Sequence, residues 1–431
     1  MFRDTQVRLS DAFRLALLFP IQLMKTHKLQ RLDHYSPIRL YPAGKDIGGL
    51  EMVVGKTAPL KILGFGTYDS QKQPRIQVLL DGLSEAGFTV DTLNAPLGYT
   101  VMESVRAVQS PIHTLGFAFR IAKRWSRLIL SRIIRRPQPD IVLVRYLAQL
   151  DVVLARVLFP KALLVTDYLV SLRETALDRR ITGRLRMILL TAVDQIAIRV
   201  SDIVVVDTEE QLLQIREPAR EKVVVVPVGA TNEWFESEIG SFPAEERPLS
   251  VIFFGLFTPL QGAPVIAECA RLVNSTNNKI LFTFVGRGQD YDECTKILKG
   301  VPGLVWKDWL SLESLISEVS RHHVCLGIFG TTPKAQRVAP TKGFQGMASG
   351  RVLVTSDSPP QRRIFKSGAV YVPVGSAESL ASVLGCLDAN REYLQQRAKA
   401  ARIVAEKYFR PVEIIKPLER KIAEVFRWPS S

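Results

Sequence analysis

Short runs of Val, Ile and Leu alternate with longer stretches of helical periodicity along most of the chain after residue 58. A first set of apolar runs predicts strands at Leu60–Gly66, Phe88–Leu93, Ile141–Tyr146, Ala162–Thr166, Ile203–Asp207 and Val223–Pro227. A second set predicts strands at Leu249–Phe254, Ile280–Val285, Val324–Phe329, Arg351–Thr355 and Ala369–Val372. Continuous apolar strands separated by helices are typical of parallel sheets covered on both faces. The pattern therefore predicts an α/β protein with two doubly wound, Rossmann-like domains.

The strand pattern breaks at Gly229–Pro248, a stretch interrupted by glycine, proline and paired glutamates. The chain thus divides into a basic leader at 1–58, an N-terminal domain at 59–230, a C-terminal domain at 231–409 and a closing segment at 410–431. Within the closing segment a helix is expected over Arg410–Phe426. Because ligands bind beyond the carboxyl ends of the strands in open α/β sheets, we expect a cleft between the two sheets.

Glycine turns follow three of the expected strands. They hold the candidate ligand-binding positions Gly66, Gly255, Gly286, Gly288 and Gln289. Glycine at a strand end lets a ligand or a facing backbone approach closely, so simple packing is the alternative interpretation. None of the three turns has the G-x-G-x-x-G spacing of a dinucleotide-binding loop, which disfavours that class of protein.

The densest polar cluster of the sequence lies between Gly327 and Gly350. This stretch begins at the end of an apolar run, continues as a loop that contains three cations and ends in an expected helix. Lys334, Arg337 and Lys342 in this loop suit a diphosphate, because cations and a helix N-terminus both favour anions. The alternative is that these are solvated loop charges.

At this point the sequence resembles the family 4 glycosyltransferases of the GT-B fold. The resemblance spans roughly residues 60–410 and is carried by ordered motifs at Val225–Ala230, Phe254–Gly262, Val285–Gly288, Ala339–Lys342 and Met347–Gly350. It implies a retaining, metal-independent transfer from a nucleotide sugar, with no resident cofactor. It also implies that the second domain holds the donor and the first domain holds the acceptor.

The sequence departs from the family pattern at its charged positions. The acidic E-x7-E pair of the family would fall on Arg337 and Gln345, and its usual Arg and Lys after the first strand of the second domain would fall on Leu256 and Gln261. The resemblance then leaves Lys334, Arg337 and Lys342 to neutralise the donor diphosphate. Gln345 is the candidate for a hydrogen bond to the ribose.

Two acids of the first domain are candidates for catalysis. Asp167 follows an expected strand at the position where many relatives place a His facing the reacting sugar. A carboxylate there could stabilise an oxocarbenium-like transition state or accept the proton of the acceptor hydroxyl. The alternative is that Asp167 caps the helix that follows. Asp69, on the first glycine turn, is the second candidate.

Residues 117–136 have the periodicity of an amphipathic helix. The apolar stripe contains Phe117, Ile121, Trp125, Leu128, Ile129 and Ile133. A basic amphipathic helix with an aromatic residue is typical of a membrane-interface element, and a core helix with a solvated basic face is the alternative. The candidate membrane contacts are Arg120, Lys123, Arg124, Trp125 and Arg127. The leader segment Phe13–Met24 and the arginines at 179, 180, 184 and 186 extend this hypothesis.

The charge distribution supports the membrane hypothesis. The 57 Lys and Arg against 42 Asp and Glu give a formal net charge of +15. Residues 1–45, 116–136 and 173–186 carry all of this excess, so the expected donor domain is near neutral. The mean hydropathy of +0.10 excludes a largely disordered chain. The four cysteines are widely spaced, which favours neither a zinc site nor a disulfide framework.

The sequence therefore predicts a cytoplasmic glycosyltransferase, peripheral to the inner membrane, that transfers one sugar to a lipid-linked, glycolipid or polysaccharide acceptor. No spanning segment or export signal is expected. The rival interpretations are a sugar-nucleotide epimerase of the same fold and a non-catalytic nucleotide-sugar-binding protein. A nucleic-acid binder is disfavoured because no recognised motif or basic stripe with stacking aromatics is found.

Overall fold

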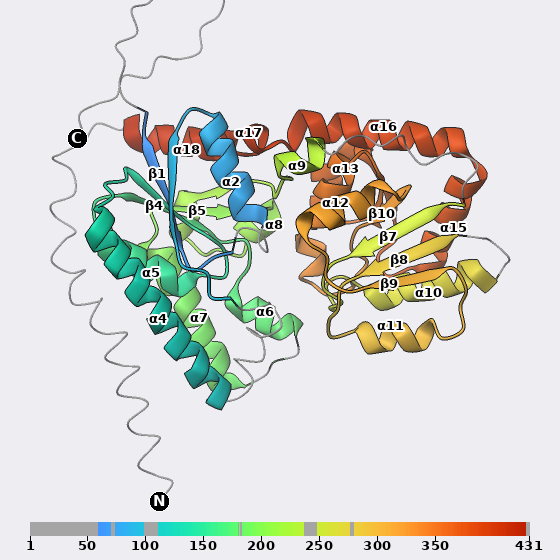
Figure 1. Ribbon diagram of the computed structural model, residues 1–431, viewed down its shortest axis with the longest axis horizontal. Helices are drawn as coiled ribbons and strands as arrows, with labels where there is room; N and C mark the ends of the chain where they lie inside the picture. The colour runs from blue at the N-terminus through green and yellow to red at the C-terminus, as the bar shows by residue number, and fades with distance from the viewer. Residues whose placement is uncertain are drawn as a thin grey trace, which may run out of the picture.

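The computed structural model describes residues 59–69, 74–98, 111–179, 181, 183–236, 248–275 and 280–427. The predicted leader at 1–58 with its segment Phe13–Met24, Arg180, and the side chain of Phe117 lie outside the described residues. The described chain forms two lobes that stand next to each other, joined along one edge by the C-terminal helices (Figure 1).

The first lobe is built on a fully parallel sheet of order β2-β1-β3-β4-β5-β6. Its strands are β1 (Lys61–Gly66), β2 (Thr89–Asn94), β3 (Ile141–Val144), β4 (Leu163–Asp167), β5 (Ile203–Val206) and β6 (Val223–Val225). Its helices are α2 (Pro74–Glu85), α4 (Pro111–Arg135), α5 (Gln149–Leu158), α6 (Leu172–Asp178), α7 (Arg184–Val200), α8 (Glu209–Leu212) and the 3₁₀ turn η1 (Ala219–Lys222).

The second lobe repeats this plan with the order β12-β11-β10-β7-β8-β9. Its strands are β7 (Ser250–Phe254), β8 (Leu281–Val285), β9 (Leu304–Lys307), β10 (Val324–Leu326), β11 (Val352–Ser356) and β12 (Ala369–Val372). Its helices are α9 (Asn232–Glu236), α10 (Ala263–Ser275), α11 (Tyr291–Ile297), α12 (Leu312–Ser320), η2 (Ala335–Arg337), α13 (Thr341–Ala348), α14 (Pro359–Phe365), η3 (Lys366–Gly368), α15 (Ala377–Ala389) and α16 (Arg391–Tyr408).

Each sheet is covered on both faces, as its apolar strands predict. Along β1, Ile62 and Leu63 belong to separate buried clusters on opposite faces of the sheet. Along β7, Phe253 and Phe254 divide in the same way. The predicted pair of doubly wound domains is thereby confirmed. The sequence pattern missed β9, a half-buried strand at the edge of the second sheet.

The chain returns to the first lobe at its C-terminal end. The helix expected over Arg410–Phe426 is divided into α17 (Pro411–Ile414) and α18 (Lys416–Arg427). The buried side chains of Ile414, Ile415 and Leu418 join the same apolar cluster as α2. Figure 1 shows α16 along the second lobe and α18 along the first. The closing segment thus completes the core of the N-terminal lobe.

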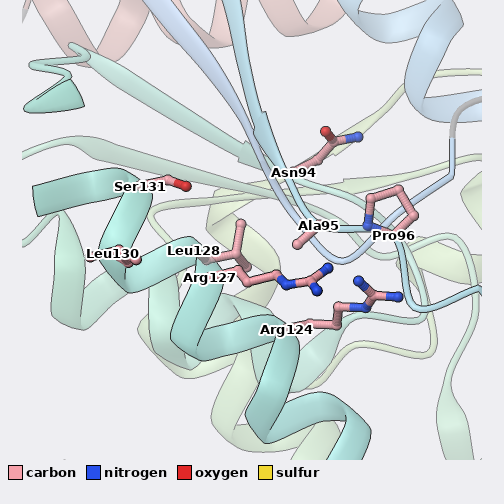
Figure 2. A pocket seen from close by; sticks show the side chains of 8 residues that line it. All are labelled: Asn94, Ala95, Pro96, Arg124, Arg127, Leu128, Leu130 and Ser131. Carbon is pink, nitrogen blue, oxygen red and sulfur yellow. The ribbon is translucent and has the colours of Figure 1, made fainter. Parts of the chain in front are cut away.

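Helix α4 crosses the carboxyl end of the edge strand β2 (Figure 2). Leu128 is 1% exposed and packs with Leu93 and Ala95 in the cluster on that face of the sheet. Ile129 and Ile133, expected on the same apolar stripe, are 37% and 60% exposed. Only part of the stripe therefore enters the core.

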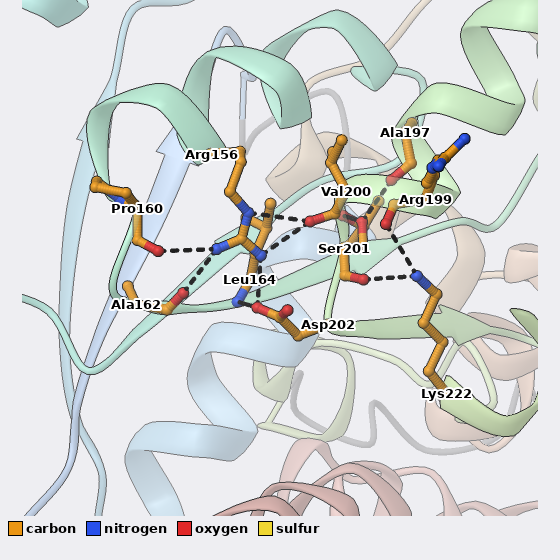
Figure 3. Close-up of polar contacts among 11 residues, drawn as sticks. Arg156, Pro160, Ala162, Leu164, Ala197, Arg199, Val200, Ser201, Asp202 and Lys222 are labelled. Carbon is orange, nitrogen blue, oxygen red and sulfur yellow. Dashed lines mark hydrogen bonds and ion pairs between the residues drawn. The ribbon is translucent and has the colours of Figure 1, made fainter. Parts of the chain in front are cut away.

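A polar network fixes the amino ends of two strands, away from the expected site (Figure 3). Arg156 of α5 donates to the Val200 carbonyl at 3.1 and 2.9 Å and pairs with Asp202 at 2.5 Å. Asp202 also accepts from the backbone N–H of Leu164 at 2.8 Å. This network ties α5, the start of β4 and the start of β5 together.

Candidate functional site

The glycine turns of the second lobe pack against each other. A Cβ on Gly286 would lie 2.3 Å from the Gly255 carbonyl oxygen, and one on Gly288 would lie 2.3 Å from that of Phe257. Gly255 itself has a φ of +124°, which few residues other than glycine adopt. The glycines therefore let the loops after β7 and β8 approach closely. Gln289 is exposed on the second of these loops.

Lys342 points at this glycine junction from the first turn of α13. Its Nζ lies 3.7 Å from the centre of the Phe253 ring and 3.6 Å from where a Cβ on Gly255 would lie. Among the described residues, this buried amine has no hydrogen-bond partner. Burial lowers the pKa of Lys342 to about 7, and the neighbouring Cys325 opposes the shift. An anion beside this amine would favour its charged form.

The other two loop cations face the first lobe. Arg337 pairs with Glu174 of α6 at 2.6 Å, and Lys334 donates to the Thr175 hydroxyl at 3.2 Å. Thr332 and Asp178 make a longer contact of 3.5 Å beside them. We call this set the α6 clasp; it consists of Glu174, Thr175 and Asp178 with Thr332, Lys334 and Arg337. Burial lowers the pKa of Lys334, and the nearby acids partly offset that effect.

Three further positions singled out in the sequence are buried or half-buried in the second lobe. Gln345, one turn after Lys342, is 6% exposed. Leu256 and Gln261, in the loop after β7, are half-buried, and the Gln261 side-chain oxygen has no partner among the described residues. The structure thus places Lys342 and Gln345 on one short helix. Within the described part of the chain, no group of three or more His, Cys, Asp or Glu could hold a metal ion.

In the first lobe, Asp167 ends β4 and is only 1% exposed. One carboxylate oxygen lies 3.5 Å from the Arg75 Nε. Burial raises the pKa of Asp167, while Arg75 and then Arg145 act against this shift. The alternative that Asp167 caps the next helix is wrong, because Ser171 accepts the capping hydrogen bond from the Glu174 N–H. Asp167 therefore belongs to a buried charge cluster.

That cluster contains three residues that the sequence analysis missed: Arg75, Arg145 and Asp207. Arg75 on α2 donates to the Val226 carbonyl at 2.8 Å and to that of Pro227. Burial raises the pKa of Asp207 to about 7, and Arg75 opposes this shift. Arg145 directly follows β3 and Asp207 directly follows β5. Both fell inside the expected strands, which ran to Tyr146 and Asp207, and so were not selected. Arg75 has no comparable signal, because its helical position alone does not reveal what it faces.

The first glycine turn is filled by a carboxylate of its own lobe. Asp151 on α5 accepts from the Thr67 backbone N–H and hydroxyl, both at 2.8 Å. A Cβ on Gly66 would lie 2.9 Å from the same oxygen. The Trp125 indole donates to the other Asp151 oxygen at 2.8 Å, so this ring faces the interior rather than the outer surface of α4. The second acid candidate, Asp69, is half-buried at the end of this turn.

The outer side of the lobe combines cations with exposed apolar side chains. Arg120, Lys123 and Arg127 are exposed, and Arg124 is half-buried. Large apolar side chains at least 44% exposed lie on α4 and α7, which we call the α4–α7 face: Phe119, Leu130, Ile133, Ile134, Leu185, Ile188 and Leu189. Both helices contact α5. None of the described helices combines the length and apolarity needed to cross a bilayer.

Comparison with known proteins identifies the fold. No family model and no curated protein matches the chain. Among solved structures, sucrose-phosphate synthase from Thermosynechococcus elongatus is similar with a TM-score of 0.63 and 13% identity, over 86% of this chain and 99% of that one. A UDP-forming trehalose-phosphate synthase from Burkholderia xenovorans gives 0.61 and 12%, over 85% and 100%.

A third similar structure is HepE from Anabaena, crystallised with UDP-glucose. It has a TM-score of 0.58 and 12% identity, over 85% of this chain and 99% of that one. These proteins share the arrangement of two facing doubly wound lobes. The chain described above has the GT-B fold.

Proposed function

We propose that this protein is a retaining, metal-independent glycosyltransferase that moves one sugar from a nucleotide sugar to a lipid-linked, glycolipid or polysaccharide acceptor at the cytoplasmic face of a membrane. The observation that carries the proposal is Lys342, a buried amine with no partner among the described residues, aimed at the glycine junction of the second lobe. A donor diphosphate at that junction would supply the missing counter-charge.

The fold supports a nucleotide-sugar donor. The carboxyl ends of parallel strands are where α/β domains bind ligands, and Gly255 and Gly286 lie at two such ends. HepE, which was crystallised with UDP-glucose, shares the fold. The second lobe is therefore the proposed donor lobe, with Gln345 as the proposed ribose contact.

The α4–α7 face supports a membrane-associated acceptor. Exposed Leu, Ile and Phe side chains next to arginines match the composition of interfacial helices. Each cation near an anionic surface contributes roughly 1 kcal/mol, so several together hold a protein there reversibly. This face lies on the lobe that the proposal assigns to the acceptor.

Thermal shift with UDP, GDP and ADP tests the donor site, because selective stabilisation identifies the nucleotide. Lys342→Ala is expected to lower nucleotide affinity at least tenfold, and Arg337→Ala to lower it less. Lys399→Ala removes an exposed lysine of the same lobe and should leave affinity unchanged. Equal affinities of the Lys342→Ala variant and the wild type would refute the donor-site assignment.

A transfer assay separates the proposal from its rivals. Radiolabelled nucleotide sugar is incubated with vesicles made from bacterial lipid extract, with and without EDTA. Transfer of label to lipid that persists in EDTA is expected. Interconversion of free nucleotide sugars without transfer would point to an epimerase, and nucleotide binding without either reaction would point to a binding protein.

A further inference from the structure

A pocket lies between the carboxyl end of β2 and helix α4. Its volume is about 330 Å³, within the range of small-molecule sites. The lining residues are Asn94, Ala95, Pro96, Arg124, Arg127, Leu128, Leu130 and Ser131 (Figure 2). These lining residues are not part of the proposed donor site.

Two guanidinium groups dominate the polar part of this pocket. Arg124 and Arg127 lie three residues apart on one face of α4, and Figure 2 shows both side chains reaching toward the Ala95–Pro96 segment. None of the described residues that line the pocket is acidic, so within this lining the two positive charges face no carboxylate. Two convergent guanidiniums bind phosphate oxygens in the fork geometry that lysine cannot reproduce.

Apolar side chains of α4 also line the pocket, and further ones follow along the same helix outside it. Leu128 is buried, whereas Leu130 is 57% exposed. The next apolar residues along α4, Ile133 and Ile134, are at least 60% exposed. A ligand with a phosphate at one end and a hydrocarbon chain at the other would match both halves of this surface.

The pocket is connected to the cleft end of the sheet. The Ala95 N–H donates to the Gly66 carbonyl at 3.0 Å, and the Leu97 N–H donates to that of Thr67 at 3.4 Å. The wall of the pocket is therefore tied to the first glycine turn. A phosphate in the pocket would lie at the same edge of the sheet as the buried charge cluster around Asp167.

We propose that this pocket binds the phosphate end of a lipid-linked acceptor, an alkyl or prenyl phosphate whose chain follows Leu130, Ile133 and Ile134. As an acceptor site, the pocket presupposes the glycosyl transfer proposed above. As a binding site for such a phosphate, it does not depend on that reaction. A direct binding measurement therefore separates a failure of the pocket from a failure of the proposed function.

The test measures binding of geranyl diphosphate to the full chain by titration calorimetry. Inorganic pyrophosphate and a short-chain phosphatidylglycerol below its micelle concentration are the comparison ligands. We expect geranyl diphosphate to bind at least tenfold more tightly than either. The double variant Arg124→Ala/Arg127→Ala should lose at least tenfold in affinity, with an unchanged Tm as the check on folding.

A matched double variant removes the same charge from the same helix outside the pocket. Lys123→Ala/Arg135→Ala alters two exposed cations that do not line it, and its affinity should stay within twofold of the wild type. Arg124→Lys/Arg127→Lys, which keeps the charge but not the fork, should recover only part of the loss.

Several results would overturn the proposal. Equal losses in the two alanine doubles would reduce the site to general charge attraction. Equal affinity for pyrophosphate would make it a free-phosphate site, and tighter binding of phosphatidylglycerol would make it a membrane-lipid site. Absence of geranyl diphosphate binding by the folded wild type would refute it directly, whatever the transfer assay gives.

Discussion

At the scale of single residues, the protein keeps several ionisable groups buried at the carboxyl ends of its strands. Lys342 is the clearest case, because its amine faces an aromatic ring and the Gly255 turn rather than a carboxylate. Cys325 is the titratable group beside it. The depressed pKa of Lys342 means that the amine loses its charge near neutral pH.

The first prediction follows from this pKa of about 7. Binding of a nucleotide diphosphate favours the charged amine and raises its pKa, so the contribution of Lys342 to binding is complete below pH 7 and declines as the pH rises above 7. We expect the Lys342→Met variant to bind UDP roughly tenfold more weakly than the wild type at pH 6, with a smaller gap at pH 8.5. Calorimetry at both values tests this.

UDP itself also titrates in this range, but this affects the wild type and the Lys342→Met variant equally. It therefore cancels in the ratio of their UDP affinities. Lys399→Met, an exposed lysine of the same lobe, is the control and should bind like the wild type at both pH values. A ratio between Lys342→Met and wild type that does not change with pH would show that Lys342 does not titrate in this range.

The second prediction concerns Asp207, whose pKa burial raises to about 7 from an ordinary value near 4. The folded state then binds a proton that the unfolded state releases, so the free energy of unfolding falls as the pH rises from about 4 to 7. Asp207→Asn removes this effect. We therefore expect the free energy of unfolding of the variant, measured relative to that of the wild type, to rise by on the order of 1–3 kcal/mol from pH 5 to pH 8.

Urea unfolding at the two pH values measures that difference. Asp202→Asn is a poor comparison because Asp202 has its own network, whereas Asp91→Asn alters an exposed acid of the same lobe. A pH-independent difference between Asp207→Asn and wild type would mean that Asp207 is ionised in the folded protein.

The residues of the Asp167 cluster show which parts of the candidate site can be predicted from the sequence. Asp167 was selected because it follows the expected strand Ala162–Thr166. The other expected strands ran past the observed ends of β3 and β5, so the same rule passed over Arg145 and Asp207. The rule cannot predict which side chain pairs with Asp167. Arg75 comes from a helix, and its contact with Asp167 and the end of β6 exists only because the sheet brings these segments together. The catalytic assignment of Asp167 stays a prediction.

At the scale of elements, the short helix α6 carries three of the polar contacts to the second lobe, through Glu174, Thr175 and Asp178. A seven-residue helix is marginal by itself, and here Asp194 of α7 holds its first turn. The Asp194 carboxylate accepts from the Ser171 hydroxyl at 2.8 Å and from the backbone N–H groups of Leu172 and Arg173 at 3.1 and 3.3 Å. This support positions Glu174 opposite Arg337.

The third prediction is that Glu174 competes with the donor for Arg337. In the α6 clasp the guanidinium is already paired with a carboxylate, which an incoming diphosphate must displace. Glu174→Gln removes that charge and is expected to raise UDP affinity about threefold to tenfold. Calorimetry under low salt tests the change.

Glu210→Gln is the matched control, because Glu210 pairs with Arg363 and so also links the two lobes. Its UDP affinity should equal that of the wild type. Equal gains in both variants would mean that a looser contact between the lobes, and not a released Arg337, improves binding. A loss of affinity in Glu174→Gln would mean that Glu174 positions Arg337 for the donor.

The apolar pattern located eleven of the twelve strands in the described part of the chain, but bounds were predicted for only two helical segments. Strand β9 (Leu304–Lys307) was missed because its four residues end in Lys and lie between Gly303 and Asp308, which leaves only a short apolar run. Helix α4 begins at Pro111, before the expected start at 117. Its period placed Trp125 on the apolar stripe. That the ring turns inward to Asp151 depends on α5, which no pattern within α4 reveals.

At the scale of the whole molecule, the uneven charge is concentrated on the first lobe and the leader, and the described part of it borders the α4–α7 face. The fourth prediction is that reversing three cations on α4 outside the pocket, Arg120→Glu/Lys123→Glu/Arg135→Glu, weakens binding to anionic vesicles. At about 1 kcal/mol for each cation lost, partitioning should fall at least roughly 100-fold. Sedimentation with vesicles at low salt measures it.

The control reverses three exposed cations on the second lobe, Lys296→Glu/Lys299→Glu/Lys399→Glu, which gives the same net charge. It should retain most of the vesicle binding. Similar losses in both triple variants would mean that net charge, and not the α4–α7 face, attracts the protein to the vesicles.

The two-lobe plan was predictable because alternating apolar strands and helices leave few other arrangements. The return of the closing segment to the first lobe could not be predicted from the sequence. The sequence of 410–427 shows an amphipathic helix, and such a pattern states that one face is buried without naming the surface that buries it. Only the folded chain shows that α17 lies against α2, where a Cβ on Gly82 would come within 2.4 Å of the Pro411 carbonyl oxygen.

The fifth prediction follows from this return. Because Leu418 and Ile422 are at most 2% exposed within the core of the first lobe, Leu418→Ala should destabilise that lobe by about 2–5 kcal/mol. Val425→Ala on the same helix, where the side chain is 43% exposed, should cost much less. Limited proteolysis with mass spectrometry would then show cleavage of the first lobe before the second. If Leu418→Ala and Val425→Ala resisted proteolysis equally, α18 would not be part of that core.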